Sequence, residues 1–254
     1  MLTAVTRRVS PAIVRCELTH LERRAIDVER AEGQHRAYEA LLAGLGCTVH
    51  SLPAEPDLPD SVFVEDAAVV LPELAVITRP GAPSRRPETA GVAAALAPYR
   101  TLARIEPPGT LDGGDVLAAG RRVFVGRSTR SDAEGVAQLR RLLEPHGYTV
   151  ESVEVRGCLH LKSAVTQVAS DAMLVNPAWV DTAAFGAWRL VEVDTAEPFA
   201  ANALLVAGRA VYPEAFPRTR ARLAAAGVEV AAVDVSELAK AEGAVTCCSL
   251  VFEA

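Results

Sequence analysis

Short apolar runs alternate with longer stretches rich in Ala, Leu and Arg along most of the chain. Apolar runs of about four to eight residues are typical of buried strands, whereas longer stretches of mixed polarity are typical of amphipathic helices. From residue 63 the segments read FVEDAAVVL, ELAVITRP, ETAGVAAALAPYR and TLARIEP. This order predicts strand, strand, helix and strand, so the pattern indicates an α/β protein built from ββαβ units.

The same unit recurs, in copies that start at residues 63, 111, 158, 199 and 244. In the second copy LDGGDVLAAG and RRVFVGRS predict strands, and a helix is expected to begin at Ser131 as its N-cap. The third copy has CLHLKSAVTQV, DAMLVNP and a helix candidate at 181–188, and the fourth has FAANALLVAG and RAVYPE. The fifth begins with AVTCCSLVF and continues at the other end of the chain, with a strand in RRVSPAIV, a helix in VERAEGQHRAYEALLAGLG and a strand in CTVHSLP.

Repeats at a spacing of roughly 40 to 50 residues are typical of radial or stacked arrays of supersecondary units. A copy divided between the two ends of the chain favours a closed ring, because one unit would then join both ends. Residues 1–254 are therefore expected to form a single domain without a linker.

Composition narrows the class of protein. Half of the 254 residues are apolar and the net charge is -6, as in an ordinary globular protein. The acidic balance, the few aromatic residues and the lack of a basic stripe argue against nucleic-acid binding. No apolar run has the length of a membrane span, and MLTAVTRRVSPAIV lacks the features of a secretory signal, so a cytoplasmic protein without a membrane partner is expected.

The five cysteines have irregular spacing and no CxxC pair, which predicts reduced thiols rather than a disulfide framework or a zinc site. By elimination, a small molecule is the expected partner. Apolar helices such as VAAALA could support a homodimer or could equally belong to the core.

The first predicted strand of each copy carries polar residues that are unusual for a buried strand. In chain order these are Glu65 and Asp66, Asp112 and Asp115, His160 and Lys162, Asn202, and Cys247. A fivefold arrangement would bring them together around one axis. Buried carboxylates are costly unless they are paired or used, so carboxylates, an imidazole and a thiol at one point indicate an active site.

Each of these residues also has a purely structural interpretation. A cysteine in an apolar strand is usually an inert hydrophobic residue, and this is the interpretation for Cys248, which would face away from Cys247. The GGD sequence that contains Asp115 could be only a tight turn whose backbone conformation requires glycine. Arginines in loops, such as Arg85 and Arg130, are often solvated surface residues.

The chemistry of the set points to a cationic substrate. A thiolate is the nucleophilic form of cysteine, and neighbouring carboxylates raise the pKa of a thiol unless a cation neutralises them. A guanidinium fits, because it offers a fork of N–H donors to carboxylates and has an electrophilic carbon. Arginines could then bind a carboxylate at the opposite end of the ligand.

Six stretches of the chain carry a resemblance to a known family: LPDSVFVEDAAVV, ITRPGAPSRRPE, TLDGGDVL, LHLKS, AAN and TCCSLVF. With these stretches in this order, the chain resembles the dimethylarginine dimethylaminohydrolase (dimethylargininase) family. This family belongs to the guanidino-modifying, amidinotransferase-like superfamily. The resemblance runs from one end of the chain to the other. It implies a five-bladed α/β propeller of pseudo-fivefold ββαβ modules, which agrees with the repeats.

The resemblance also implies a role for each matching residue. Cys247 corresponds to the nucleophile, His160 to the general acid and base, and Asp112 to a carboxylate that hydrogen-bonds the guanidinium. The residues implied in substrate binding are the acids Asp60, Glu65 and Asp66, the arginines Arg85 and Arg130, and Leu18 as a lid residue.

The implied reaction is hydrolysis of N-omega-methylated arginine to citrulline and methylamine or dimethylamine, through a covalent thiouronium adduct on Cys247. The resemblance implies neither a metal nor an organic cofactor; Zn²⁺ bound adventitiously by the thiol and imidazole would inhibit.

Two alternatives stay open. Arginine deiminases resemble this fold but usually carry Asp two residues after the catalytic His, where this chain has Lys162. This difference favours hydrolysis of methylated arginine over the first alternative, an arginine deiminase-like hydrolysis of another guanidino compound. The repeats could also form a non-catalytic ligand-binding propeller.

Overall fold

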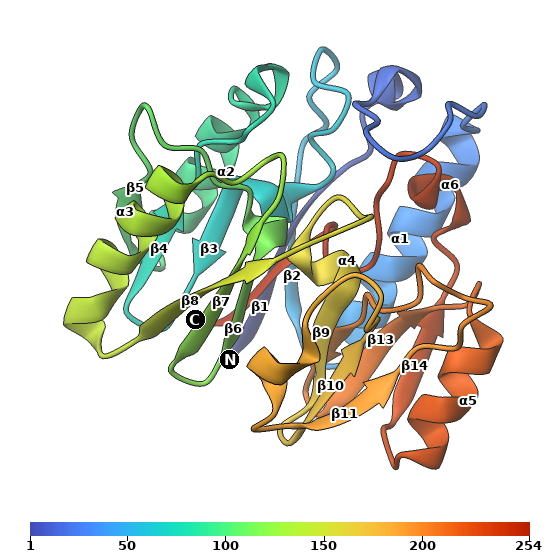
Figure 1. Cartoon of the computed structure of the whole chain (residues 1–254). Coiled ribbons are helices and arrows are strands. Elements are labelled where there is room, and N and C mark those ends of the chain that lie inside the picture. The colour runs from blue at the N-terminus through green and yellow to red at the C-terminus, as the bar shows by residue number, and fades with distance from the viewer.

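The computed structural model describes all 254 residues and contains five sheets of three strands each (Figure 1). In every sheet the first strand of the module runs antiparallel to the second, and the second runs parallel to the third. A parallel pair needs a crossover connection, and a helical segment supplies it in each module. The predicted ββαβ modules in a propeller-like α/β fold are therefore confirmed.

The strands and helices follow the predicted copies. The first module comprises β3 (Ala68–Val70), β4 (Leu74–Ile77), α2 (Glu88–Leu96) and β5 (Thr101–Arg104). The second comprises β6 (Val116–Ala119), β7 (Arg122–Arg127), α3 (Ala133–Leu143) and β8 (Thr149–Glu154). The third comprises α4 (Leu161–Ala164), β9 (Val165–Ala169), β10 (Ala172–Val175) and β11 (Arg189–Glu192). The fourth comprises β12 (Leu204–Val206), β13 (Arg209–Pro213), α5 (Pro217–Ala225) and β14 (Val230–Val233), and is followed by α6 (Ser236–Ala239).

The fifth module joins the two ends of the chain, as predicted. Strand β15 (Leu250–Glu253) pairs antiparallel with β1 (Leu2–Arg7), with Leu2 opposite Glu253. Helix α1 (Val28–Gly44) then leads to β2 (Thr48–Leu52), which lies parallel to β1. Figure 1 shows both termini near the middle of the molecule.

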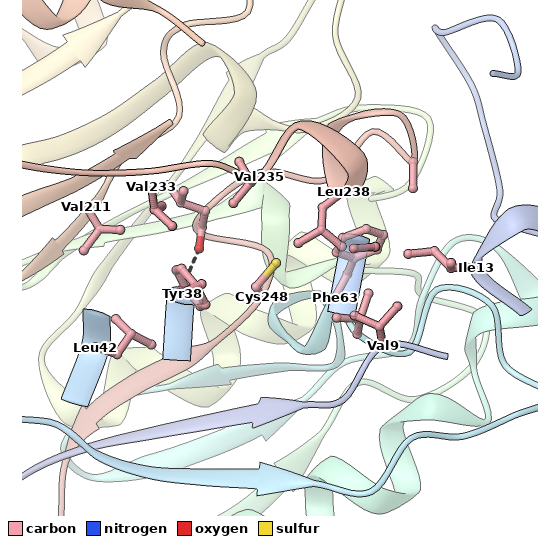
Figure 2. Close-up of a cluster of buried hydrophobic side chains, with 14 of the residues drawn as sticks. Val9, Ile13, Tyr38, Leu42, Phe63, Val211, Val233, Val235, Leu238 and Cys248 are labelled. Atoms are coloured by element: carbon pink, nitrogen blue, oxygen red, sulfur yellow. Dashed lines mark hydrogen bonds between the residues drawn. The ribbon is translucent and has the colours of Figure 1, made fainter. Parts of the chain in front are cut away.

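Five clusters of buried apolar side chains hold neighbouring modules together, and each cluster takes most of its residues from two modules. They join modules one and two, two and three, three and four, four and five, and five and one. Figure 2 shows part of the cluster between modules four and five, which includes Val211 and Leu42. Since every module packs against two neighbours, burial of apolar surface closes the ring.

Short helical turns precede the first strands of three modules, and here the sequence-based prediction was wrong. The 3₁₀ helices Val64–Ala67 and Gly113–Asp115 lie before β3 and β6, and the one-turn helix α4 lies before β9. Cys247 and Cys248 lie in a turn before β15, not within a strand. Alternation of apolar residues cannot distinguish a strand from a turn that is equally buried.

The N-cap of α3 also differs from the prediction by one residue. Asp132, not Ser131, caps the helix, and its carboxylate accepts a hydrogen bond from the Gly135 amide at 2.7 Å. The Ser131 hydroxyl instead donates to the Asp115 carboxylate at 2.6 Å. The predicted helix at 181–188 is a shorter 3₁₀ helix, Thr182–Phe185, capped by Asp181. None of the helices combines the length and apolar character needed to cross a membrane.

The first strands of all five modules surround one cavity of about 430 Å³. Its walls include residues of β3, β6, β9, β12 and β15, so it lies on the axis of the ring. The turns that precede these strands stand at one end of this axis, where the polar residues collect.

Candidate active site

The reactive side chains lie on the turns that lead into the first strands. Asp66 belongs to the 3₁₀ helix before β3, Asp112 is the N-cap before β6, and His160 is the N-cap of α4. The turns approach each other closely at Gly114, where a Cβ atom would lie 2.6 Å from His160 Nδ1 and 2.7 Å from Asp66 Oδ1. Glycine therefore lets the backbone come within hydrogen-bonding distance of the catalytic candidates.

His160 is buried between two carboxylates. Its Nε2 atom lies 3.0 Å from Asp112 Oδ2 and its Nδ1 atom lies 3.9 Å from Asp66 Oδ1. Burial lowers the pKa of the imidazole, but the nearby charge of Asp66 and the hydrogen bond with Asp112 outweigh it and raise the pKa to about 9. His160 is therefore protonated at neutral pH and can donate a proton.

Asp112 is fully buried behind His160. One carboxylate oxygen pairs with His160, and the other accepts a hydrogen bond from the Gly81 amide at 2.9 Å. This arrangement fixes the orientation of the imidazole. The predicted contact between Asp112 and the guanidinium stays a prediction.

Asp66 remains ionised in spite of its burial. The Arg85 Nη1 atom lies 2.6 Å from its Oδ2 atom, and the Gly114 amide donates to Oδ1 at 2.9 Å. Burial raises the pKa of Asp66, but the charges of His160 and Arg85 together lower it to about 2. The site thus keeps a negative charge that can attract a cation.

Cys247 contributes the thiol. Burial raises the pKa of this thiol to about 12, together with the charges of Glu65 and Asp66. The predicted effect of carboxylates on the thiol is confirmed in direction, and without a cationic ligand the thiol is protonated at neutral pH. Cys248 is fully buried in the apolar cluster (Figure 2), and its thiol donates a hydrogen bond to the Ala244 carbonyl.

A small pocket of about 20 Å³ connects these groups. Its walls include most of the predicted site residues, namely Asp60, Asp66, Arg85, Arg130, His160 and Cys247. Leu18, Glu65 and Asp112 are not among its lining residues. The pocket has room for about one water molecule, so a ligand the size of an amino acid requires the walls to move.

The two predicted arginines have different surroundings. Arg85 is buried, and its guanidinium contacts Asp66, Glu88 and the carbonyls of Asp60 and Phe63. Arg130 makes a single side-chain hydrogen bond, from Nη2 to the Thr19 hydroxyl at 3.0 Å. Arg130 is therefore freer to bind an added carboxylate, and that role stays a prediction for both.

A loop around Leu18 covers the pocket. The Glu17 amide donates to the Asp60 carboxylate at 3.1 Å. The carboxylate of Glu242 accepts hydrogen bonds from three successive amides of this loop, those of residues 19–21. Glu242 adopts a left-handed backbone conformation with φ of 58°. Leu18 is half-buried against the apolar cluster between modules four and five, as suits the predicted lid.

Glu242 was missed by sequence reasoning, as were Glu17 and Glu88. The contact between Glu242 and the loop spans more than 220 positions, so no local pattern indicates it. The one available signal is that Glu242 lies five residues before the nucleophile candidate.

Asp66, Asp112 and His160 have ligand atoms within 4.8 Å of one another, as in a metal site. Each is already engaged: Asp66 with Arg85, and Asp112 with His160. The guanidinium 2.6 Å from Asp66 would repel a metal cation. These residues therefore fit a hydrogen-bonded acid and base better than a metal centre.

No known protein-family profile matches the chain. It is 42% identical over 249 residues to the N(G),N(G)-dimethylarginine dimethylaminohydrolase of Streptomyces coelicolor, covering 97% of this chain and 95% of that protein. It is 36% identical to the Pseudomonas aeruginosa protein of the same name, covering 89% and 90%. The crystal structure of a mutant of the Pseudomonas aeruginosa protein with citrulline superposes with a TM-score of 0.94 and 33% identity, covering 99% of this chain and 100% of that chain.

Proposed function

The chain belongs to the dimethylarginine dimethylaminohydrolase family, and we propose that it hydrolyses N-omega-methylated arginine to citrulline and methylamine or dimethylamine. The observation that carries the proposal is the arrangement of Cys247, His160 and Asp66 around one closed pocket. Together they supply a thiol, a protonated imidazole and a negative charge for a cation.

The substrate guanidinium takes part in its own activation. Placed beside Asp66, it adds a positive charge next to the Cys247 thiol. This charge stabilises the thiolate and lowers the pKa of the thiol from about 12, so that the proton can leave to solvent. Arg130 and Arg85 bind the carboxylate of the substrate at the opposite end, and Asp60 and Leu18 complete the site.

The thiolate then attacks the guanidinium carbon and forms a C–S bond. His160 gives its proton to the methylated nitrogen, the C–N bond breaks, and methylamine or dimethylamine leaves. The product of this step is a thiouronium adduct on Cys247. Neutral His160 next takes a proton from water, and the resulting hydroxide attacks the same carbon. The C–S bond then breaks and the hydroxyl proton leaves to solvent, which releases citrulline and the thiolate.

Asp112 acts through His160, because it holds the imidazole in the orientation that these two proton transfers need. The closed loop over the pocket excludes bulk water while the adduct forms. The closed ring of inter-module clusters further supports residues 1–254 as a single catalytic domain.

The test is the release of citrulline and amine from asymmetric dimethylarginine, monomethylarginine and arginine, measured in parallel with the native protein and Cys247→Ser. We expect amine from both methylated substrates and none with the variant. Turnover of arginine alone would instead indicate a deiminase activity. Full activity of Cys247→Ser would contradict the proposed nucleophile.

A further inference from the structure

Four polar side chains lie behind the Cys247 turn and outside the catalytic pocket. They come from four different modules and are Glu65, Lys162, Asn202 and Thr246. Glu65, Lys162 and Thr246 line the wide axial cavity instead. Asn202 is the only polar residue of the fourth module in the repeated position, and the reaction described above does not use it.

These side chains form one continuous hydrogen-bonded group. The Thr246 hydroxyl donates to Glu65 Oε2 at 2.7 Å and accepts from Asn202 Nδ2 at 2.9 Å. The Thr246 amide donates to Asn202 Oδ1 at 3.1 Å. Lys162 Nζ donates to Glu65 Oε1 at 2.6 Å, and its carbonyl accepts from Asn202 at 3.0 Å.

The group holds the backbone before Cys247 and the carbonyl of Cys247 itself. Thr246 is fixed by its side chain and by its amide, and the Cys247 carbonyl accepts a hydrogen bond from the Glu65 amide at 3.1 Å. Asn202 and Thr246 are almost completely buried, at 4% and 3% exposure. Loss of one partner would leave a buried polar atom without a hydrogen bond, so the arrangement is strongly determined.

The group also sets the charge behind the thiol. Among the neighbouring charges, that of Glu65 raises the pKa of the Cys247 thiol most, and the Lys162 ammonium is paired with this carboxylate. The other titratable groups around the thiol are Asp66 and His160 on the neighbouring turns, Glu17, Asp60, Arg85, Arg130 and Glu242 on the pocket wall, and Tyr38 and Cys248 toward the core. Glu65 differs from these groups, because the cation that pairs with it, Lys162, lines the axial cavity and not the catalytic pocket.

We propose that Glu65, Lys162, Asn202 and Thr246 form a bracket that positions Cys247 for attack and balances the charge behind its sulfur. In this arrangement the carboxylate of Glu65 holds Thr246, beside the nucleophile, instead of contacting the substrate. Asn202 and Thr246 are positioning residues, since they act through Cys247. The inference rests on the proposed function for its kinetic consequence, but its effect on the thiol does not require turnover.

The kinetic experiment compares Thr246→Val with Thr166→Val. Thr166 is a matched control: it is equally buried, lines the same cavity and forms two hydrogen bonds, but these go to the backbone of residues 201 and 203. We expect Thr246→Val to lower kcat about 10- to 100-fold with KM changed less than about threefold, and Thr166→Val to keep kcat within about threefold. Thr246→Ser, which retains the hydroxyl, should restore most of the activity.

The second experiment measures the rate at which iodoacetamide alkylates Cys247 in the free protein at pH 8, with the adduct located by mass spectrometry. Glu65→Gln removes the negative charge and leaves Lys162 near the thiol, so alkylation should become about tenfold faster, the effect of one pKa unit. This measurement tests the electrostatic role of the bracket even if Thr246→Val does not fold, or if the native protein turns over none of the substrates.

Equal losses of kcat in Thr246→Val and Thr166→Val would overturn the positioning role, because they would show that any buried threonine matters as much. An unchanged or slower alkylation of Glu65→Gln would overturn the electrostatic role. Absence of turnover in the native protein, with faster alkylation in Glu65→Gln, would reject the proposed function while supporting the electrostatic role of the bracket.

Discussion

At one end of the ring axis the turns enclose about 20 Å³, and at the other end the first strands surround about 430 Å³. The narrow end is lined mostly by charged and polar side chains, whereas the wide end is lined mainly by apolar ones. The backbone explains the difference. Strands use their N–H groups in the sheets, but turns leave amides such as those of Gly81 and Gly114 free to bind Asp112 and Asp66.

Enclosure at the narrow end gives each charge a large effect. With little water between them, Asp66 and His160 shift each other's pKa in opposite directions, to about 2 and about 9. At the wide end Glu65 is paired with Lys162 and borders a cavity with room for water. If this comparison is correct, substitutions at the narrow end change the catalytic rate. Substitutions at the wide end should not change it, except at the four residues of the bracket.

The two adjacent thiols provide the largest expected contrast. Cys247→Ala removes the nucleophile in the narrow pocket and should lower kcat about 10³-fold or more. Cys248→Ala removes a sulfur that is buried in the apolar cluster, so kcat should stay within about threefold although the protein loses some stability. Steady-state kinetics and thermal unfolding of both variants test this. Similar losses of kcat in the two variants would contradict the assignment of Cys247 alone as the nucleophile.

The next largest effect is expected for the carboxylate behind the imidazole. Asp112→Asn removes the charge that holds His160 and should lower kcat about 10²- to 10³-fold, with a smaller change in KM. The pKa of His160 should also fall, which can be followed by NMR titration of its ring protons. Asp171→Asn, on an exposed side chain, serves as the control. An unchanged pKa of His160 in Asp112→Asn would argue that Asp66 alone sets the protonation of the imidazole.

The pH dependence of kcat/KM follows from the two shifted groups. The reactive form combines thiolate with protonated imidazole, and it has one proton fewer than the form that dominates below pH 9. Activity should therefore rise about tenfold per pH unit well below pH 9, and about fiftyfold from pH 7 to 9. Activity should level off near the pKa of His160, at about 9. Above this pH the dominant form has a neutral imidazole and a thiol, which is the same number of protons as in the reactive form, so the ratio of the two forms no longer depends on pH. A plateau that begins below pH 7 would show that the free thiol is already ionised.

A smaller effect is expected at the loop that covers the narrow end. Glu242→Gln removes the charge that accepts three backbone amides, and hydrogen bonds to a charged group are the stronger kind. We expect KM to rise about tenfold while kcat changes less, and the amides of residues 19–21 to exchange hydrogen faster. Glu214→Gln, on the exposed edge after β13, is the matched control. Unchanged amide exchange would show that the loop is held by other contacts.

The smallest effect is expected at the wide end. Gln167 lines the axial cavity and makes only a hydrogen bond of 3.4 Å, to the Ser170 carbonyl. Gln167→Ala should leave kcat and KM within about twofold, measured in the same assay. A loss as large as that of Glu242→Gln would mean that the contents of the wide cavity influence the reaction, which would break the distinction between the two ends.

The order of elements could be predicted from the sequence because each module repeats the same alternation of apolar and polar residues. The convergence of Asp66, Asp112, His160 and Cys247 could be predicted for the same reason, as all four hold equivalent places in the repeat. The turns that carry them could not, because a buried 3₁₀ turn such as Val64–Ala67 has the apolar content of a strand.

Contacts that cross modules were also beyond sequence reasoning. Arg130 is predicted at the site, but its hydrogen bond to the Thr19 hydroxyl joins the second module to the N-terminal loop of the fifth. The hydrogen bonds from the amides of residues 19–21 to Glu242 form only when the ring is closed. Repeats specify positions within a module, whereas these contacts need the relative placement of two modules.

The pairing of β1 with β15 has a consequence for how the protein folds. It joins residues separated by almost the whole chain, and such contacts form late because the entropy of closing a long loop opposes them. The turn with Cys247 lies directly before β15 and also needs Glu65 of the first module and Asn202 of the fourth. A chain that has folded four modules but not closed the fifth would thus hold Cys247 apart from the residues that position it, so the appearance of activity during refolding should report the closing step itself.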